Sequence, residues 1–171
     1  TISCSERDLL DLIGEDMDRA RLLSLLPLAK AGFDGEEDGQ LRIELQDTNR
    51  PDLWSCEGLA RQLQAHLRGA PPSYPFFRGK AARAGGRVEV DAGLRDIRPV
   101  VGAFVARGVE VDEPTLIQII QTQEKLCEGY GHKRREAAMG VYDASAIEFP
   151  VRYRAAAPDE TRFVPLGVDG R

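Results

Sequence analysis

The sequence predicts an α+β fold, and three patterns in its 171 residues support this prediction. Residues 41–46 (LRIELQ) alternate apolar and polar side chains, as a half-buried strand does. Residues 56–67 place apolar side chains at steps of three and four, as a helix covering such a strand does. Residues 69–86 hold prolines and glycines at a density that neither helices nor strands tolerate. We therefore expect three parts: an N-terminal module at 1–70, a linker at 71–86 and a second segment at 87–171.

Two helices and a loop are expected before the first predicted strand. Ser5 is a candidate N-cap for a helix over residues 6–13, and a rough helical stripe of apolar side chains follows Asp16. Residues 31–40 (AGFDGEEDGQ) are rich in glycine and acidic side chains, so we expect a loop there.

Residues 49–58 (NRPDLWSCEG) lead into the next helix and contain the only tryptophan. Asn49 tolerates a left-handed turn, Pro51 fixes φ, and Asp52 or Ser55 can cap the helix. Because each of these residue types has a local structural reason, turn chemistry alone favours a scaffold role for this stretch.

The second segment is predicted to begin with strands. Residues 86–92 (GRVEVDA) alternate, residues 98–112 contain an apolar run long enough for a well-buried strand, and residues 149–158 have the character of another strand. A helix is predicted over 114–128, because Pro114 fits its first turn and the preceding acids favour the positive end of its dipole.

This predicted helix carries a glutamine among apolar neighbours. Five side chains cluster on one face, namely Leu116, Ile119, Ile120, Leu126 and Cys127. Gln123 falls within that face and Glu124 lies at its edge. Two interpretations stay open: Gln123 pairs with a backbone group in the core, as buried amides usually do, or Gln123 and Glu124 face a cleft.

The turn after this helix is basic. Lys133, Arg134 and Arg135 either form a solvated helix end, the commoner arrangement, or face a carboxylate or phosphate. Residues 61–171 hold 17 basic and 14 acidic side chains, whereas residues 1–60 hold 6 and 14, so we expect the later part to meet any anion. No dense basic block with interleaved aromatics occurs, so charge alone does not predict nucleic-acid binding.

Composition and motifs exclude several kinds of protein. With 42% apolar and 30% charged residues the chain has ordinary globular usage, and no apolar run approaches the roughly 20 residues of a membrane span. Three widely spaced cysteines and two distant histidines predict no disulfide framework and no metal site. There is no phosphate-binding glycine motif and no complete catalytic constellation. We expect a cytoplasmic protein that does not contact a membrane.

Two stretches resemble one known family. IELQDTNRPDLWSCEGLARQLQAHLRG (residues 43–69) resembles the first-module motif of the phenylalanyl-tRNA synthetase β subunit. Residues 97–167, with their Gln-Glu-Lys-Leu helix, Lys-Arg pair and Phe-x-Pro-Leu stretch, resemble the archaeal and eukaryotic-cytosolic type of that subunit. The positions matching the first motif, expected to be structural, are Asn49, Arg50, Pro51, Asp52, Glu57 and Gly58. Trp54 and Cys56 stand where aliphatic residues are expected.

The resemblance implies a function. The enzyme is an α2β2 heterotetramer that uses ATP and Mg²⁺ to activate phenylalanine and esterify it to tRNA-Phe. The catalytic centre lies in the α subunit, while the β subunit contributes a mixed α/β editing domain that hydrolyses tRNA mischarged with tyrosine. The family's editing pocket draws on a Gln-Glu pair and a nearby Arg, and the matching positions are Gln123, Glu124 and Arg134. Lys133 and Arg135 are then candidate contacts for the anion or tRNA, and no cofactor is expected in this segment.

Two hypotheses follow from the resemblance. In the first, the chain is an N-terminal part of the β subunit, with a structural role and one wall of the editing site, and does not hydrolyse substrate by itself. Its start at Thr1 and end at Arg171 favour this hypothesis. In the second, it is a free-standing paralogue that acts as a non-catalytic binding or interaction module.

Overall fold

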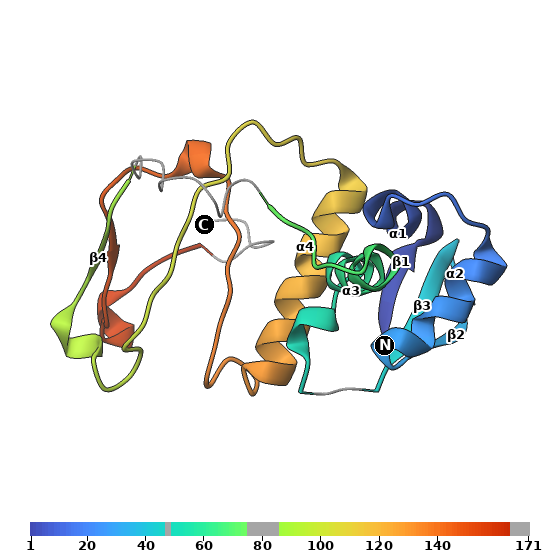
Figure 1. The fold of residues 1–171 in the computed structure, drawn as a ribbon. Coiled ribbons are helices and arrows are strands. Elements are labelled where there is room, and N and C mark those ends of the chain that lie inside the picture. Colours follow the sequence, from blue (N-terminus) through green and yellow to red (C-terminus); the bar gives the residue numbers. More distant parts are fainter. Residues whose placement is uncertain (47–48, 75–85, 165–171) are drawn as a thin grey trace. The chain divides into compact units, whose positions relative to one another are not determined.

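The computed structural model describes residues 1–46, 49–74 and 86–164 (Figure 1). The chain divides into two compact units: unit 1 is Thr1–Arg78 with Glu110–Tyr142, and unit 2 is Gly79–Val109 with Asp143–Arg171. Helices and strands occur together, which confirms the α+β class. Most of the predicted linker 71–86 lies outside the described residues, and the boundaries predicted at residues 70 and 86 stay a prediction.

Unit 1 contains an antiparallel sheet with strand order β1-β3-β2. Strand β1 (Ile2–Ser5) pairs with β3 (Gln40–Leu45), with Ile2 opposite Ile43. Strand β3 confirms the strand predicted at residues 41–46, and its alternating pattern buries Leu41 and Ile43. Strand β1, which is four residues long, was not predicted from the sequence.

The predicted loop over residues 31–40 is wrong. Residues Ala31–Glu37 form strand β2, which pairs with β3 through a two-residue hairpin. Asp38 and Gly39 both have positive φ, 52° and 73°, as the favoured hairpin turn with the twist of the strands requires. An Asp-Gly pair is a hairpin signal, but the acidic and glycine-rich composition around it concealed the strand.

Three helices pack on one face of this sheet. They are α1 (Glu6–Ile13), α2 (Arg19–Leu25), continued by a 3₁₀ helix at Leu26–Ala29, and α3 (Cys56–Arg68). Ser5 caps α1 as predicted, with its hydroxyl accepting from the Asp8 N–H at 3.3 Å. Ser55 caps α3 and accepts from the Gly58 N–H at 3.0 Å, which decides between the two caps considered for that helix.

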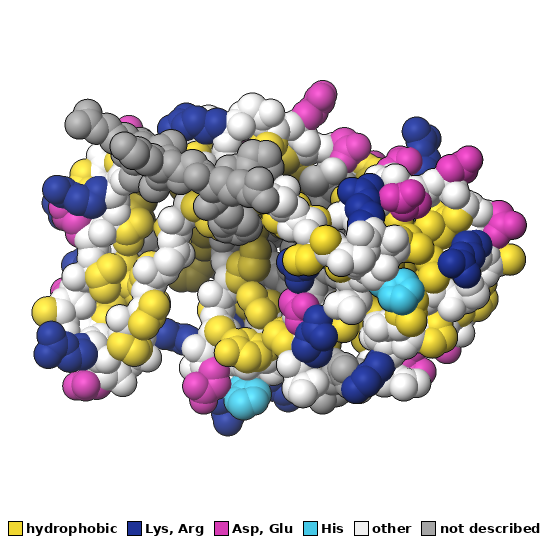
Figure 2. Space-filling view, viewed as in Figure 1, with side chains coloured by type: hydrophobic (Ala, Val, Ile, Leu, Met, Phe, Trp, Pro, Cys, Tyr) yellow, Lys and Arg dark blue, Asp and Glu magenta, His cyan; other side chains and the backbone are white. Residues whose placement is uncertain are grey.

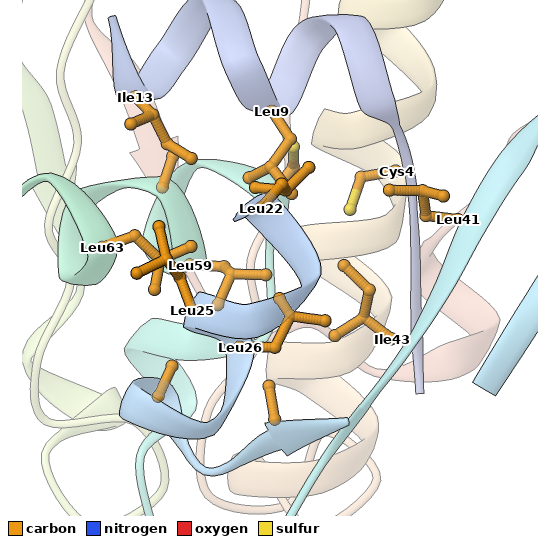
Figure 3. Packing of buried hydrophobic residues seen from close by; sticks show 14 of the residues in the cluster. Cys4, Leu9, Ile13, Leu22, Leu25, Leu26, Leu41, Ile43, Leu59 and Leu63 are labelled. Carbon is orange, nitrogen blue, oxygen red and sulfur yellow. The ribbon is translucent and has the colours of Figure 1, made fainter. Parts of the chain in front are cut away.

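The core of unit 1 lies between these helices and the sheet. Figure 3 shows side chains of α1, α2 and α3 converging on the inward residues of β1 and β3. The fully buried members include Leu9, Ile13, Leu22, Leu41, Ile43, Leu59 and Leu63. Truncating a side chain of this kind costs about 2–5 kcal/mol, so this core fixes the positions of everything attached to it.

The fourth helix of unit 1 confirms the helix predicted over residues 114–128. Helix α4 (Glu113–Lys125) is capped by Asp112, whose carboxylate accepts from the Thr115 N–H at 2.9 Å. A π-helical turn, Leu126–Tyr130, continues it past the predicted end at Gly129. None of the helices in the described ranges is long and apolar enough to cross a membrane.

Unit 2 contains a two-stranded parallel sheet. Strands β4 (Val88–Val90) and β5 (Val151–Tyr153) confirm two predicted strands, although each is only three residues long. Short 3₁₀ helices occur at Ala92–Leu94, Ala144–Ala146 and Pro158–Glu160, and the Phe149–Pro150 peptide is cis.

The well-buried strand predicted within residues 98–112 is wrong. This stretch has no regular structure, and Val100 and Phe104 are 85% and 92% exposed. An apolar run forms a buried strand only where a partner strand and a covering layer exist, and the described part of unit 2 holds just one pair of short strands. Hydrophobic side chains therefore lie on the surface around β4, as Figure 2 shows.

Candidate functional site

Helix α4 is held to the edge of the unit 1 sheet by glutamine side chains. The Gln121 amide donates to the Ser3 carbonyl at 2.9 Å, and its oxygen accepts from the Ser3 N–H at 2.7 Å. Gln118 donates to the same carbonyl at 3.3 Å. Since β1 is an edge strand, its outward backbone groups lack a neighbouring strand, and the Gln121 carboxamide supplies both the donor and the acceptor that such a strand would supply.

This docking turns the predicted apolar face of α4 away from the sheet. Leu116 and Ile120 are 47% and 46% exposed, while Ile119 and Leu126 are half-buried and Cys127 is buried. The buried glutamine is Gln118, at 6% exposure, whereas Gln123 is half-buried and Glu124 is exposed. The physical reason is that the backbone groups at a strand edge need hydrogen-bonding partners more than apolar cover. Gln118 and Gln121 form the hydrogen bonds to a backbone group that were considered for Gln123.

The basic turn after α4 has an unusual backbone. His132, Lys133 and Arg134 have φ values of 47°, 58° and 65°, so three successive residues with side chains adopt the left-handed conformation. Such a conformation costs roughly 1–2 kcal/mol per residue for L-amino acids other than glycine. The backbone of this turn is therefore unusual for a helix end, whether its charges are solvated or face an anion.

Backbone hydrogen bonds maintain this turn. The Lys133 N–H donates to the Glu128 carbonyl at 3.2 Å, and the Arg134 N–H donates to the Cys127 carbonyl at 3.0 Å. The buried Cys127 sulfur accepts from the Met139 N–H at 3.2 Å, which attaches the following chain. A Cβ at Gly131 would lie 2.2 Å from the Ala137 carbonyl oxygen, so only glycine permits this close return of the backbone.

The side chains of the turn point their charge outward. Lys133, Arg134 and Arg135 are all exposed. Arg134 donates to the Glu128 carboxylate in an ion pair whose side chains are 53% and 49% exposed. An exposed ion pair of this kind contributes about 0–1 kcal/mol to stability.

Glu128 was not predicted as the acidic partner of Arg134, because this contact depends on the left-handed turn reversing the chain. A run of Gly129, Gly131 and basic residues directly after a helix is the signal that such a reversal was available. Glu124, the predicted acidic member, lies one helical turn earlier and is exposed.

The residues of the first motif form a different kind of arrangement. Arg50 donates two hydrogen bonds to the Asp52 carboxylate, at 2.9 and 2.8 Å, and Arg61 donates a third at 3.3 Å. The hydrogen bonds from Arg50 hold the pKa of Asp52 below its usual value. A Cβ at Gly58 would lie 1.7 Å from the Asp52 carbonyl oxygen, so α3 approaches the turn as closely as only glycine allows.

Unit 1 also has an acidic surface pocket of about 300 Å³. Asp8, Asp11, Glu57 and Asp112 contribute to its lining, and none of Gln123, Glu124 and Arg134 does. Its negative charge disfavours an anionic ligand. Across residues 1–46, 49–74 and 86–164, no group of three or more His, Cys, Asp or Glu side chains could hold a metal ion.

Known proteins resemble this chain in sequence and in structure. The phenylalanine–tRNA ligase β subunit of Borrelia garinii subspecies bavariensis is 45% identical over 164 residues, and that of Borrelia turicatae is 45% identical over 166 residues. Each match covers 94% of this chain and 29% of the relative, so the chain spans less than a third of the length of these curated relatives. No protein-family model matches the sequence.

A crystal structure of an N-terminal fragment of the phenylalanyl-tRNA synthetase β subunit from Pyrococcus horikoshii has a TM-score of 0.82 to this chain. The two are 36% identical in sequence, and the match covers 99% of this chain and 49% of the fragment. Agreement in sequence and in fold over almost all residues leads to one conclusion: the chain belongs to the family of phenylalanine–tRNA ligase β subunits.

Proposed function

We propose that this chain functions as part of a β subunit in the charging of tRNA-Phe with phenylalanine, and that residues 121–135 form one wall of the site that hydrolyses mischarged Tyr-tRNA. Its other residues act as a scaffold that holds this wall. The α subunit, paired with β in an α2β2 tetramer, carries the ATP and Mg²⁺ chemistry of activation, and tRNA-Phe is the shared substrate.

The observation that carries the editing role is the strained turn at His132–Arg134. Strain in a backbone that the fold does not otherwise need marks a candidate functional position. In this turn the strain accompanies three exposed cations at Lys133, Arg134 and Arg135. Tyr-tRNA is a polyanion with a reactive ester at its end, and such cations are suited to holding its phosphates.

The glutamines of α4 have two different roles in this proposal. Gln121 and Gln118 hold the helix on Ser3, so they serve the scaffold. Gln123 and Glu124 lie on a part of the helix that β1 does not occupy, where an amide and a carboxylate are available to the substrate. The proposal thus assigns positioning to one pair of residues and substrate contact to the other.

The test is hydrolysis of Tyr-tRNA-Phe by a complete β subunit assembled with its α subunit. We expect Gln123→Ala and Arg134→Ala to slow this hydrolysis at least tenfold, since each removes a contact made during editing, while phenylalanine activation is unchanged. The matched control is Arg42→Ala, because Arg42 is also an arginine paired with carboxylates, with a side chain that is 42% exposed. Equal hydrolysis rates in all four proteins would reject the editing role.

A further inference from the structure

The only tryptophan of the chain lies against the segment that leads into the basic turn. Trp54 follows the 3₁₀ helix Pro51–Leu53, and this helix contacts the π-helical turn Leu126–Tyr130. A Cβ added at Gly129 would lie 2.6 Å from one carbon of the Trp54 ring and 3.0 Å from another. The first motif and the basic turn, about 75 residues apart in sequence, therefore meet at this contact.

The Trp54 ring fills the space beside Gly129 that a side chain at this position would need. Gly129 has no side chain, its φ is not positive, and the space that a methyl group would fill is occupied by the indole ring. The glycine is thus explained by the ring and not by the backbone conformation. Trp54 itself is half-buried.

The backbone that carries Trp54 is fixed by its two neighbours in sequence. Leu53 and Ser55 on either side of Trp54 are buried, and Ser55 caps α3. Gly129 follows Glu128, which pairs with Arg134, and precedes by three residues the left-handed stretch that begins at His132. A fixed ring on one side of Gly129 therefore limits where the turn can lie.

We propose that Trp54 is a positioning residue for the basic turn: by packing on Gly129 it fixes the backbone that presents Lys133 and Arg134 to the substrate. Its consequence for editing rests on the function proposed above. The first motif, whose polar residues stabilise its own turn and the start of α3, then also contributes to the site through this one aromatic side chain.

Hydrogen exchange of the 171-residue chain tests the positioning directly. We expect Trp54→Ala to speed exchange of the amides of residues 133, 134 and 136 at least tenfold relative to the amides of α1 in the same molecule. Phe33→Ala is the control, since it removes an exposed aromatic from β2 of the same unit. An unchanged ratio in Trp54→Ala would overturn the proposal.

If Trp54→Ala folds poorly, a pair of compensating substitutions, larger at residue 129 and smaller at residue 54, tests the same contact. Gly129→Ala should clash with the ring and also speed exchange in the turn, and adding Trp54→Leu should restore slow exchange because the smaller side chain leaves room for the methyl group. Rescue of this kind is not expected from two residues that merely stabilise the fold separately. Failure of Trp54→Leu to restore Gly129→Ala would contradict the contact.

Editing by the complete αβ enzyme separates this inference from the function on which it rests. Both hold if Gly129→Ala slows Tyr-tRNA hydrolysis at least tenfold and the double variant restores it. If exchange is rescued but neither Gly129→Ala nor Arg134→Ala affects hydrolysis, positioning stands and the proposed editing role fails. If Arg134→Ala slows hydrolysis but Trp54→Ala leaves hydrogen exchange in the turn unchanged, the editing role stands and the positioning role of Trp54 is overturned.

Discussion

Residues 49–58 and residues 126–136 are both short connecting segments of unit 1, yet their local chemistry differs. In the first, Arg50 and Arg61 satisfy Asp52, and Gly58 permits the close approach of α3. In the second, His132, Lys133 and Arg134 adopt left-handed conformations, and the cationic side chains of Lys133, Arg134 and Arg135 are exposed. The first segment follows the rules of turn stability, whereas the second departs from them.

Because of this difference, the segment that identifies the family and the segment proposed to function are not the same. A segment in which every residue type has a local reason is explained by the fold it stabilises. The second segment keeps Lys133 and Arg134 in a conformation that glycine would adopt more easily, and strain of this kind marks a candidate functional position. The conspicuous first motif thus identifies the family, while the less conspicuous turn is the candidate site.

The largest effect should come from Gly58→Ala. Its methyl group would lie 1.7 Å from a backbone oxygen, so the turn at Asp52 must move and its hydrogen bonds to Arg50 and Arg61 must change. We expect a loss of about 3 kcal/mol in the free energy of unfolding, measured by urea denaturation.

Gly32→Ala provides the matched control for that substitution. Gly32 lies in β2 with nothing within 4 Å of an added Cβ, so we expect a change below about 0.5 kcal/mol. Similar losses in the two variants would contradict a specific steric role for Gly58.

The next effect concerns the edge of the sheet. Gln121→Ala removes both hydrogen bonds to Ser3, and we expect it to lower the free energy of unfolding by about 1 kcal/mol. Gln123→Ala should change it by less than about 0.5 kcal/mol, because β1 is held by the other two glutamines. A larger loss of unfolding free energy in Gln123→Ala than in Gln121→Ala, measured by denaturation, would contradict the assignment of Gln121 to the scaffold.

Much of unit 1 could be predicted because its signals are local. Ser5 and Ser55 as caps, the alternation around Leu41 and Ile43, and Asp112 with Pro114 at the start of α4 each depend on a few neighbouring residues. The exposed run around Phe104 could not be predicted, because apolar periodicity does not say whether a covering layer exists.

The candidate site was predictable only in part, for the same reason. The resemblance indicated Gln123, Glu124 and Arg134, but the pairing of Arg134 with Glu128 and the docking of Gln121 on Ser3 join residues through the folded backbone. Helical periodicity placed the apolar face of α4 correctly on the helix but could not tell which face meets the sheet.

A smaller effect, of opposite sign, should come from relieving strain in the turn. His132→Gly and Lys133→Gly each remove the cost of a left-handed side-chain residue, and we expect each to raise the free energy of unfolding by about 0.5–1 kcal/mol. Only Lys133→Gly should also weaken binding of tRNA-Phe, because only it removes a cation. Destabilisation by both variants in thermal denaturation would show that the turn is not strained.

The smallest effect is a pH dependence from Asp52. Because its pKa is lowered in the folded protein, its contribution is present above the unfolded value near 4 and is lost as pH falls through the folded value. The stability difference between the wild type and Asp52→Asn should thus be constant from pH 5 to 7 and shrink below about pH 4. Its size should stay below about 1 kcal/mol, since the carboxylate is 38% exposed.

Denaturation at several pH values, with Asp34→Asn as a control for the loss of one exposed acid, measures this difference. A difference that stays constant down to pH 2 would be at odds with a lowered pKa for Asp52.

The most direct test of the account is to ask whether the basic turn touches the mischarged end of the tRNA. A photo-crosslinking amino acid in place of Arg135 in the complete αβ enzyme, irradiated with Tyr-tRNA-Phe, should attach to the nucleotides that carry the ester. The same group in place of Arg42, a half-exposed arginine on the hairpin of unit 1, should not. Equal attachment from both positions, or attachment from residue 135 only to distant parts of the tRNA, would contradict the assignment of this turn to the editing site.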